Sequence, residues 1–213
     1  MITLSDIDTA VRAHQELLEE RDALMLKFAR YYASVKHAGQ TYSGDLPYTH
    51  HLAAVEAVLR RFGGPGVDDG EMLAAAWLHD VVEDTGTKLK QIEELFGAEV
   101  ARLVGAVTNE PGENRKVRHA LTYPKIREAG PKAVVLKLAD RIANVEAGGS
   151  MVKMYRKEYE SFKRNLYTIG QSSAMWLHLD LILLRPESCD CTDWRISHGK
   201  NHWEQCSSIL EGK

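Results

Sequence analysis

The stretch Trp77-Leu-His-Asp-Val-Val-Glu-Asp-Thr85 sets a histidine beside an aspartate, His79 and Asp80, in an otherwise apolar run. Two more carboxylates, Glu83 and Asp84, follow within one helical turn. Burying ionisable side chains costs free energy unless a cation, a hydrogen-bonding partner or water compensates them. This run therefore predicts a metal centre.

The spacing within the run suggests how the centre works. Positions four apart share one face of a helix, so we expect His79 to lie above Glu83 and Asp80 to lie above Asp84. Imidazole together with carboxylate suits manganese, iron or zinc better than calcium, which prefers oxygen ligands alone. Such a cation lowers the pKa of a bound water, and a neighbouring carboxylate can accept the proton. The doublet alone is a weak signal, because a buried histidine is more often simply hydrogen-bonded.

Around this run, apolar residues recur at helical spacing along almost the whole chain, and the period-two alternation of strands is nearly absent. The pattern predicts an all-α fold. Turn-forming residues predict loops over residues 39–47 and 109–114. The expected helices run from Thr3 or Ser5 to Leu18, over 24–35, from His50 to Leu59, from a cap at Asp68 or Asp69 into His79, and then over 89–96, 98–108, 115–127, 131–147, 152–169 and 175–184.

Length and charge narrow the class of protein. We expect the 213 residues to form one large domain over 1–185, with core motifs in 24–147, and a tail over 186–213. The formal charge of −3 gives no basic footprint for nucleic acid. The N-terminus lacks the features of a secretory signal, and no apolar run is long enough to span a bilayer. We therefore expect a cytoplasmic protein without nucleic-acid or membrane partners, and its oligomeric state stays open.

The tail contains residues that can bind zinc, namely Cys189, Cys191, His198, His202 and Cys206. Its two histidines have the four-residue separation of many zinc sites. The Cys-Asp-Cys spacing, however, is tighter than the usual gap between zinc ligands. A small structural zinc site and an ordinary loop with incidental thiols both stay open, and the spacing favours the loop.

Two further motifs complete the pattern set by the doublet. His51 lies in Pro47-Tyr-Thr-His-His-Leu-Ala-Ala-Val55, and Asp140 lies in Leu138-Ala-Asp-Arg-Ile-Ala-Asn144. Together with the first run, they follow the order and approximate spacing of the HD superfamily of metal-dependent phosphohydrolases. Within it the chain resembles the hydrolase domain of the Rel/Spo alarmone enzymes and their small, hydrolase-only relatives, over about residues 24–146.

This resemblance implies an all-α HD-domain helical bundle with a metal site in its core cleft. It implies hydrolysis of guanosine tetra- or pentaphosphate at the 3′-diphosphate, which releases pyrophosphate, with Mn²⁺ or another divalent transition metal as the cofactor. No synthetase domain follows, so we expect hydrolysis only. By motif position the resemblance assigns His51, His79, Asp80 and Asp140 as metal ligands, Glu83 and Asp84 as the catalytic carboxylates that position or deprotonate water, and Asn144 as a contact to the nucleotide sugar.

The substrate-binding residues are less well defined. Where the family usually has a basic pair that grips guanine, this chain has Tyr42 and Ser43. Tyr42 can still stack on a base. Lys137, Arg115 and Lys116 are candidates for binding a polyphosphate. The basic group that includes the last two equally well forms a solvated helix face.

A second departure follows Asn144, where Glu146 stands in place of the family's basic residue. An acid there would repel a polyphosphate if it faced the substrate. Two alternatives therefore stay open: a phosphatase for another nucleotide or a dinucleotide such as NADPH, and a nucleotide-binding sensor without turnover. The sensor is less favoured, because every presumed ligand and both presumed catalytic carboxylates are present.

Overall fold

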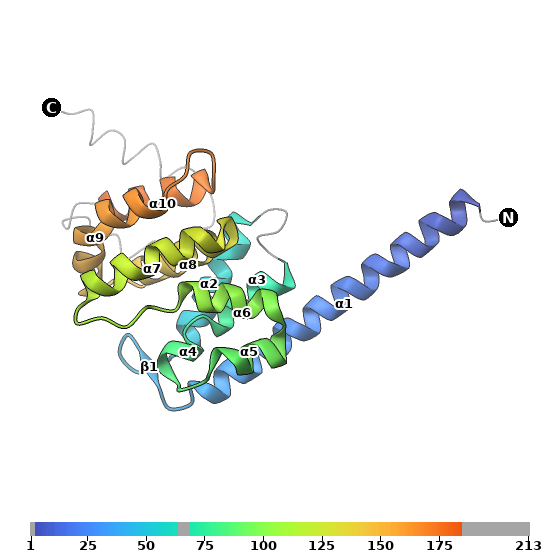
Figure 1. The fold of residues 1–213 in the computed structure, drawn as a ribbon, viewed down its shortest axis with the longest axis horizontal. Coiled ribbons are helices and arrows are strands. Elements are labelled where there is room, and N and C mark those ends of the chain that lie inside the picture. Colours follow the sequence, from blue (N-terminus) through green and yellow to red (C-terminus); the bar gives the residue numbers. More distant parts are fainter. Residues whose placement is uncertain (1–2, 64–68, 185–213) are drawn as a thin grey trace. The chain divides into compact units, whose positions relative to one another are not determined.

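α-Helices make up most of the described residues, 3–63 and 69–184, in the computed structural model of the chain (Figure 1). This confirms the predicted all-α class. The elements are α1 (Leu4–Lys36), β1 (Thr41–Tyr42), β2 (Leu46–Pro47), α2 (Thr49–Phe62), α3 (Gly70–Leu78), α4 (Val81–Asp84), α5 (Leu89–Phe96), α6 (Ala98–Val107), α7 (Arg115–Ala129), α8 (Pro131–Glu146), α9 (Met151–Leu166) and α10 (Ser173–Leu184).

The first element, α1, is one continuous helix, so the prediction of two separate helices in this region is wrong. Residues 19–23 contain no glycine or proline, and most of them are strong helix formers, so nothing there interrupts the backbone hydrogen bonds. The side chains of residues 3–21 are all exposed, whereas Leu26, Ala29 and Ala33 are buried. The C-terminal half of α1 therefore supplies its part of the core.

The predicted loop over residues 39–47 contains a tight β-hairpin, in which Tyr42 pairs with Leu46. Ser43 and Gly44 turn the chain with φ angles of 46° and 83°, a left-handed conformation that glycine adopts at little cost. Each strand has only 2 residues, too few to show a period-two pattern in the sequence. The hairpin leads directly into α2 and places Tyr42 beside the predicted metal ligands.

The core forms where α2, α3, α6 and α8 pack against one another (Figure 1). Residues 72–78 of α3 are each at most 8% exposed. The start of α3 is capped as predicted, because Asp69 Oδ1 accepts a hydrogen bond from the Met72 amide at 2.7 Å. Pro131 likewise occupies the first turn of α8, where its missing N–H costs nothing. These helices carry the site residues on rigid, buried elements.

The helix is interrupted between α3 and α4, at the His79-Asp80 doublet. The prediction of one helix through His79 and Asp80 is therefore wrong. His79 ends α3, and Asp80 begins the single turn of α4 with φ −99° and ψ −7°. The Asp84 amide still donates to the Asp80 carbonyl oxygen at 2.8 Å. Neighbouring side chains on a regular helix diverge. The break lets the adjacent histidine and aspartate face the same point.

Among the described residues, no helix has the length and apolar character needed to cross a membrane. Asp68 and the tail lie outside the described residues. The zinc alternative at Cys189, Cys191, His198, His202 and Cys206, and the domain boundary at residue 185, therefore stay predictions.

Candidate metal centre

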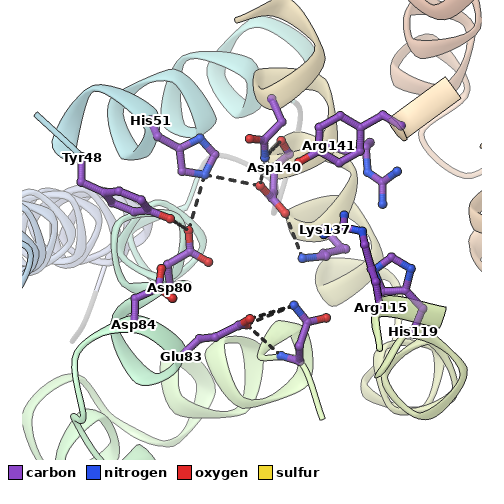
Figure 2. Close-up of a pocket in the computed structure, with 13 residues that line it drawn as sticks. Tyr48, His51, Asp80, Glu83, Asp84, Arg115, His119, Lys137, Asp140 and Arg141 are labelled. Carbon is purple, nitrogen blue, oxygen red and sulfur yellow. Dashed lines mark hydrogen bonds and ion pairs between the residues drawn. The ribbon is translucent and has the colours of Figure 1, made fainter. Parts of the chain in front are cut away.

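The four predicted ligands meet at one place from three parts of the chain: His51 from the first turn of α2, His79 and Asp80 from the junction of α3 and α4, and Asp140 from α8. Figure 2 shows three of them, His51, Asp80 and Asp140. The Nε2 atoms of His51 and His79 lie 3.3 Å apart. Asp80 Oδ2 lies 3.0 Å from His79 Nε2 and 3.5 Å from His51 Nε2. Asp140 Oδ1 lies 3.4 Å from His51 Nε2 and 3.8 Å from His79 Nε2.

The hydrogen bonding of His79 prepares its ring to bind a cation. Its Nδ1 lies 2.8 Å from the Ala76 carbonyl oxygen. Because a carbonyl only accepts, Nδ1 carries a hydrogen, and Nε2 of the neutral ring has a lone pair. That lone pair faces two carboxylates and a second imidazole. Acceptors that converge in a buried place need a cation among them, so these residues fit a divalent transition metal.

The charges of the site point the same way. Burial opposes a positive charge on His79, but the carboxylates of Asp80 and Asp140 outweigh it and raise the pKa of His79 to about 10. Burial also opposes ionisation of both acids, yet the imidazoles hold the pKa of Asp80 well below its usual range, and Lys137 with the imidazoles does the same for Asp140. The site keeps its acids ionised and attracts a positive charge, either a proton or a metal ion.

Asp140 is held in place by its neighbours on α8. Lys137 Nζ donates to Asp140 Oδ2 at 2.9 Å, and Asn144 Nδ2 donates to Asp140 Oδ1 at 2.5 Å. Residues three and four apart lie side by side on a helix, which makes both contacts local. Tyr42 Oη in turn donates to Asn144 Oδ1 at 3.0 Å. Asn144, predicted to touch a sugar, thus also orients a presumed ligand.

The two predicted catalytic carboxylates lie beside the centre on α4. Glu83 accepts hydrogen bonds from the backbone amide and the side-chain amide of Asn109, both at 3.0 Å. Burial and the nearby charge of Asp80 raise the pKa of Asp84. Tyr48 Oη donates to Asp80 Oδ2 at 2.6 Å and fixes that carboxylate. Glu83 is therefore held in one orientation, and Asp84 has the increased basicity that a proton acceptor requires.

These groups line a cavity of about 180 Å³ with opposite charge on its two sides (Figure 2). An oxygen-rich ligand that binds a metal at one side can therefore meet cations at the other. One side carries the acids Asp80, Glu83 and Asp84, and the other carries the nitrogen-bearing side chains of Arg115, His119, Lys137 and Arg141.

Arg141 is a buried cation on the basic side, with 2% of its surface exposed. Its guanidinium packs 4.5 Å from the ring centroid of Tyr155 and 4.3 Å from that of Phe162. Arg141 Nη1 has no hydrogen-bond partner in the described part of the chain and lies 3.6 Å from Glu158 Oε2. The other oxygen of Glu158 accepts from Arg115 Nε at 2.7 Å. Arg141 Nη1 can therefore donate a hydrogen bond to an anion.

Two predicted substrate contacts lie outside the cavity lining. The ring of Tyr42 stacks on that of His51, with centroids 4.8 Å apart and an interplanar angle of 26°. Lys116 is exposed, next to the lining residue Arg115. Their roles as substrate contacts stay predictions.

Glu146 does not act as an unpaired acid. It accepts hydrogen bonds from Arg61 Nη2 at 2.7 Å and from His178 Nε2 at 2.6 Å. Its charge is therefore used to join α8 to α2 and α10, and it does not line the cavity.

Several lining residues were not singled out as site residues from the sequence. Arg141 had a usable signal, because Asp140-Arg141 interrupts the apolar residues Leu138-Ala139 and Ile142-Ala143, and a buried arginine is rare without a partner. His119 lies in the predicted basic helix, and burial together with the charges of Arg115 and Arg141 lowers its pKa to about 3, so the ring is neutral. The remaining ones are Tyr48, Asn109 and Tyr155.

Histidines and aspartates contributed in this order by successive parts of a helical bundle are the mark of the HD class of domain. Residues 29–168 match the model of the HD domain family, and the chain belongs to that family. Human guanosine-3′,5′-bis(diphosphate) 3′-pyrophosphohydrolase MESH1 is 36% identical over 126 residues, which cover 58% of this chain and 69% of the relative. These findings confirm the resemblance predicted from the sequence.

A solved structure agrees with this relationship. A metazoan orthologue of SpoT, which hydrolyses ppGpp and plays a role in starvation responses, matches with a TM-score of 0.64 and 28% identity, over 74% of this chain and 93% of its own.

Several curated relatives are much longer than the matching region. The probable GTP pyrophosphokinase of Mycobacterium leprae is 29% identical over 187 residues, which cover 82% of this chain and 23% of the relative. The chain spans 15% of the probable guanosine-3′,5′-bis(diphosphate) 3′-pyrophosphohydrolase of Synechocystis (41% identical over 115 residues, 51% of this chain) and 63% of MESH1 from Danio rerio. It therefore corresponds to less than two thirds of each of these proteins.

Proposed function

We propose that this chain is a metal-dependent phosphohydrolase that hydrolyses the 3′-diphosphate of a guanosine polyphosphate such as ppGpp and releases pyrophosphate, with Mn²⁺ as the cofactor. The observation that carries the proposal is the convergence of three buried ligand side chains, His51, His79 and Asp140, with the half-buried Asp80 beside them, at a cavity with a cationic far side. The names of the human and Synechocystis relatives support the substrate.

The ligands are His51, His79, Asp80 and Asp140. A divalent cation held by them would supply a bound water of lowered pKa. The protein contributes rigid ligand geometry: the Ala76 carbonyl fixes the tautomer of His79, Tyr48 fixes Asp80, and Lys137 with Asn144 fixes Asp140.

We propose that the two carboxylates of α4 orient the attacking water and accept its proton. Asp84 is the proton acceptor, because its raised pKa makes it a stronger base than an ordinary aspartate. Glu83, held by two donors of Asn109, orients the water. These roles agree with the catalytic assignment made from the sequence.

The basic side of the cavity binds the phosphate oxygens in this proposal. Arg115, Lys137 and Arg141 offset the negative charge that grows on the attacked phosphoryl group and on the leaving pyrophosphate. Neutral His119 offers a ring nitrogen for a hydrogen bond. Lys116 reaches a long substrate from outside the lining.

One observation favours a second substrate class, another nucleotide or a dinucleotide such as NADPH. Tyr42 and Ser43 stand where the family resemblance leads one to expect a basic pair, and the hydroxyl of Tyr42 is engaged by Asn144. An arginine fork that can recognise a guanine edge is therefore replaced at this position.

A substrate panel tests the proposal. The purified protein is stripped with a chelator, reloaded with Mn²⁺, Fe²⁺ or Zn²⁺, and incubated with ppGpp, GTP and NADPH while phosphate and pyrophosphate are quantified. We expect ppGpp and water to give GDP and pyrophosphate, fastest with Mn²⁺. Release of phosphate from NADPH without turnover of ppGpp would establish the second substrate class. The absence of product from every compound would refute the proposed enzymatic activity.

A further inference from the structure

The β-hairpin reaches the metal centre through one side chain, Tyr42. We propose that Tyr42 is a positioning residue that aligns His51 and Asn144 in the centre, and that it does not grip the base of the substrate. This inference rests on the proposed metal centre, because the residues it aligns are a presumed ligand and the partner of another.

The two histidines of the centre are oriented by different means. His79 Nδ1 is anchored to the Ala76 carbonyl oxygen at 2.8 Å. His51 Nδ1 is buried and has no hydrogen-bond partner within the described ranges. The rotation of the His51 ring therefore depends on what packs against it. A ligand imidazole that lacks the usual hydrogen bond on its second nitrogen needs another constraint.

The ring of Tyr42 supplies that constraint. It stacks on His51 at 4.8 Å with a 26° interplanar angle. Tyr48 meets Tyr42 edge-on, at 6.1 Å and 85°, and His51 at 5.7 Å and 72°. Offset-stacked and edge-to-face pairs at these distances are favourable. The three rings thus form an aromatic corner that fixes the direction of His51 Nε2.

The hydroxyl of Tyr42 acts on the other half of the centre. It donates to Asn144 Oδ1 at 3.0 Å, so the amide oxygen of Asn144 is turned toward the hairpin. The amide nitrogen then faces Asp140 and donates to its Oδ1 at 2.5 Å and to its carbonyl oxygen at 3.0 Å. The opposite orientation of the amide would set an oxygen against both acceptors. The acceptors of Asp140 therefore set the orientation of the amide, and Tyr42 fixes its position by donating to the amide oxygen that is left over.

The hairpin itself is braced, so it can present Tyr42 rigidly. The Gln40 carbonyl oxygen accepts from the Tyr48 amide at 3.0 Å. The side chain of Gln40 donates to the Asp84 carbonyl oxygen at 3.1 Å, and its own oxygen lies 2.7 Å from His37 Nδ1. These contacts tie the hairpin to α4 on one side while Tyr42 ties it to α8 on the other.

Two substitutions separate the ring from the hydroxyl. Tyr42→Phe keeps the stack and removes the hydrogen bond to Asn144, so we expect the affinity for Mn²⁺ to fall about 2- to 10-fold. Tyr42→Leu removes both constraints, and we expect metal affinity or kcat to fall about 10- to 100-fold while KM for the nucleotide changes less than about 2-fold. Tyr31→Phe, at an exposed tyrosine of α1, is the matched control and should change nothing.

The measurements are Mn²⁺ affinity by calorimetry, the visible absorption spectrum of the Co²⁺-loaded protein, and kcat and KM. The spectrum of the Tyr42→Leu variant should differ from that of the wild type, because a reoriented His51 changes the ligand field. If Tyr42→Leu raises KM about 10-fold and leaves metal affinity and spectrum unchanged, Tyr42 is a substrate contact and the inference is overturned. If Tyr42→Leu does not fold, the test is the Mn²⁺ affinity of Tyr42→Phe. An affinity equal to that of the wild type would then overturn the inference. A wild-type protein that binds neither ion refutes the centre itself, which is a distinct result.

Discussion

Asp80 and Asp140 lie beside the same pair of imidazoles, Asp80 half-buried and Asp140 buried, but their surroundings differ. Asp140 has the ammonium group of Lys137 at 2.9 Å as a permanent countercharge. Asp80 has the neutral hydroxyl of Tyr48 and the ring of His79. The charge of Asp80 is therefore the one that depends more strongly on a cation in the centre, and its removal should affect metal binding directly.

Asp80→Ala should abolish metal binding and turnover together. A presumed ligand is removed, and even residues behind metal ligands contribute about 10- to 100-fold, so we expect a loss of more than about 100-fold in kcat. Metal content by mass spectrometry and the substrate assay check this. Asp8→Ala, at an exposed aspartate of α1, is the control. Retained turnover in Asp80→Ala would remove the doublet from the mechanism.

His119 makes stability depend on pH. Burial and the charge of Arg115 lower its pKa from 6.5 to about 3 in the folded protein. Between these values the unfolded chain binds a proton that the folded chain does not, so stability present above pH 6.5 is lost as the pH falls. The contribution of one such group approaches about 1.4 kcal/mol per pH unit.

His119→Asn removes this group, so the free energy of unfolding should fall less between pH 7 and pH 5 in the variant than in the wild type. Urea unfolding with a chelator present measures it, and comparing the two proteins cancels the other titrating groups. Equal losses in the two proteins would contradict the assignment.

One buried carboxylate links three elements. Glu56 of α2, 5% exposed, accepts from Arg30 of α1 at 2.5 and 3.1 Å, from Arg60 at 2.8 Å, and from the indole of Trp77 on α3 at 2.5 Å. Hydrogen bonds to a charged group are stronger than neutral ones, and an abandoned buried donor loses its solvation as well. Glu56 should therefore matter for stability although it is not one of the residues that line the cavity.

Glu56→Ala should lower the free energy of unfolding by about 2–3 kcal/mol, because it leaves the Trp77 indole and Arg30 without their acceptor. Glu94→Ala is the matched control, since that carboxylate is exposed and lies 3.7 Å from Lys90. Its effect should be below about 0.5 kcal/mol. Chemical denaturation checks both, and an equally small effect for Glu56 would contradict its structural role.

A glycine sets how closely α1 and α3 approach. A Cβ atom added at Gly70 would lie 2.4 Å from Asp22 Cβ and 2.7 Å from Asp22 Cα, so the backbones must separate. We expect Gly70→Ala to destabilise the protein by about 1–3 kcal/mol. At Gly105 an added Cβ would meet the flexible end of Leu89 at 2.7 Å, which can move aside. Thermal unfolding of both variants should show a clearly larger loss for Gly70→Ala.

The elements were predictable to the extent that local residues define them. Gly97, with φ 89°, and Gly130, with φ 94°, end α5 and α7 close to the predicted places, because this conformation suits glycine alone at low cost. The hairpin and the break at the doublet depend instead on tertiary contacts. Tyr42 and Asn144 are joined over 102 positions of sequence, and no local pattern contains that information.

Across the whole chain, the candidate site also divides into a part that local sequence defines and a part that depends on tertiary contacts. The four presumed ligands could be named because their motifs are compact. The basic side of the cavity needs α7, α8 and α9 to come together, and Tyr155 of α9 became visible as a lining residue only in that arrangement. The cytoplasmic location and the domain boundary at residue 185 stay predictions of the sequence.

Removal of residues 1–20 should leave the domain intact. The side chains of residues 3–20 are all exposed, so deleting them loses little buried surface. We expect the midpoint of thermal unfolding to change by less than about 3 °C and the affinity for Mn²⁺ to stay the same. A decrease of more than about 10 °C would show that this segment packs against something in solution.

The division of the cavity into an acidic and a basic side also bears on how a reaction cycle would end. In the proposed reaction, pyrophosphate carries its charge on the same kind of oxygens that Arg115, Lys137 and Arg141 would attract in the substrate. A wall that stabilises the leaving group therefore retains it after cleavage. In such a site departure of the product competes with cleavage as the slowest step, added pyrophosphate inhibits, and rising ionic strength speeds release while it weakens capture.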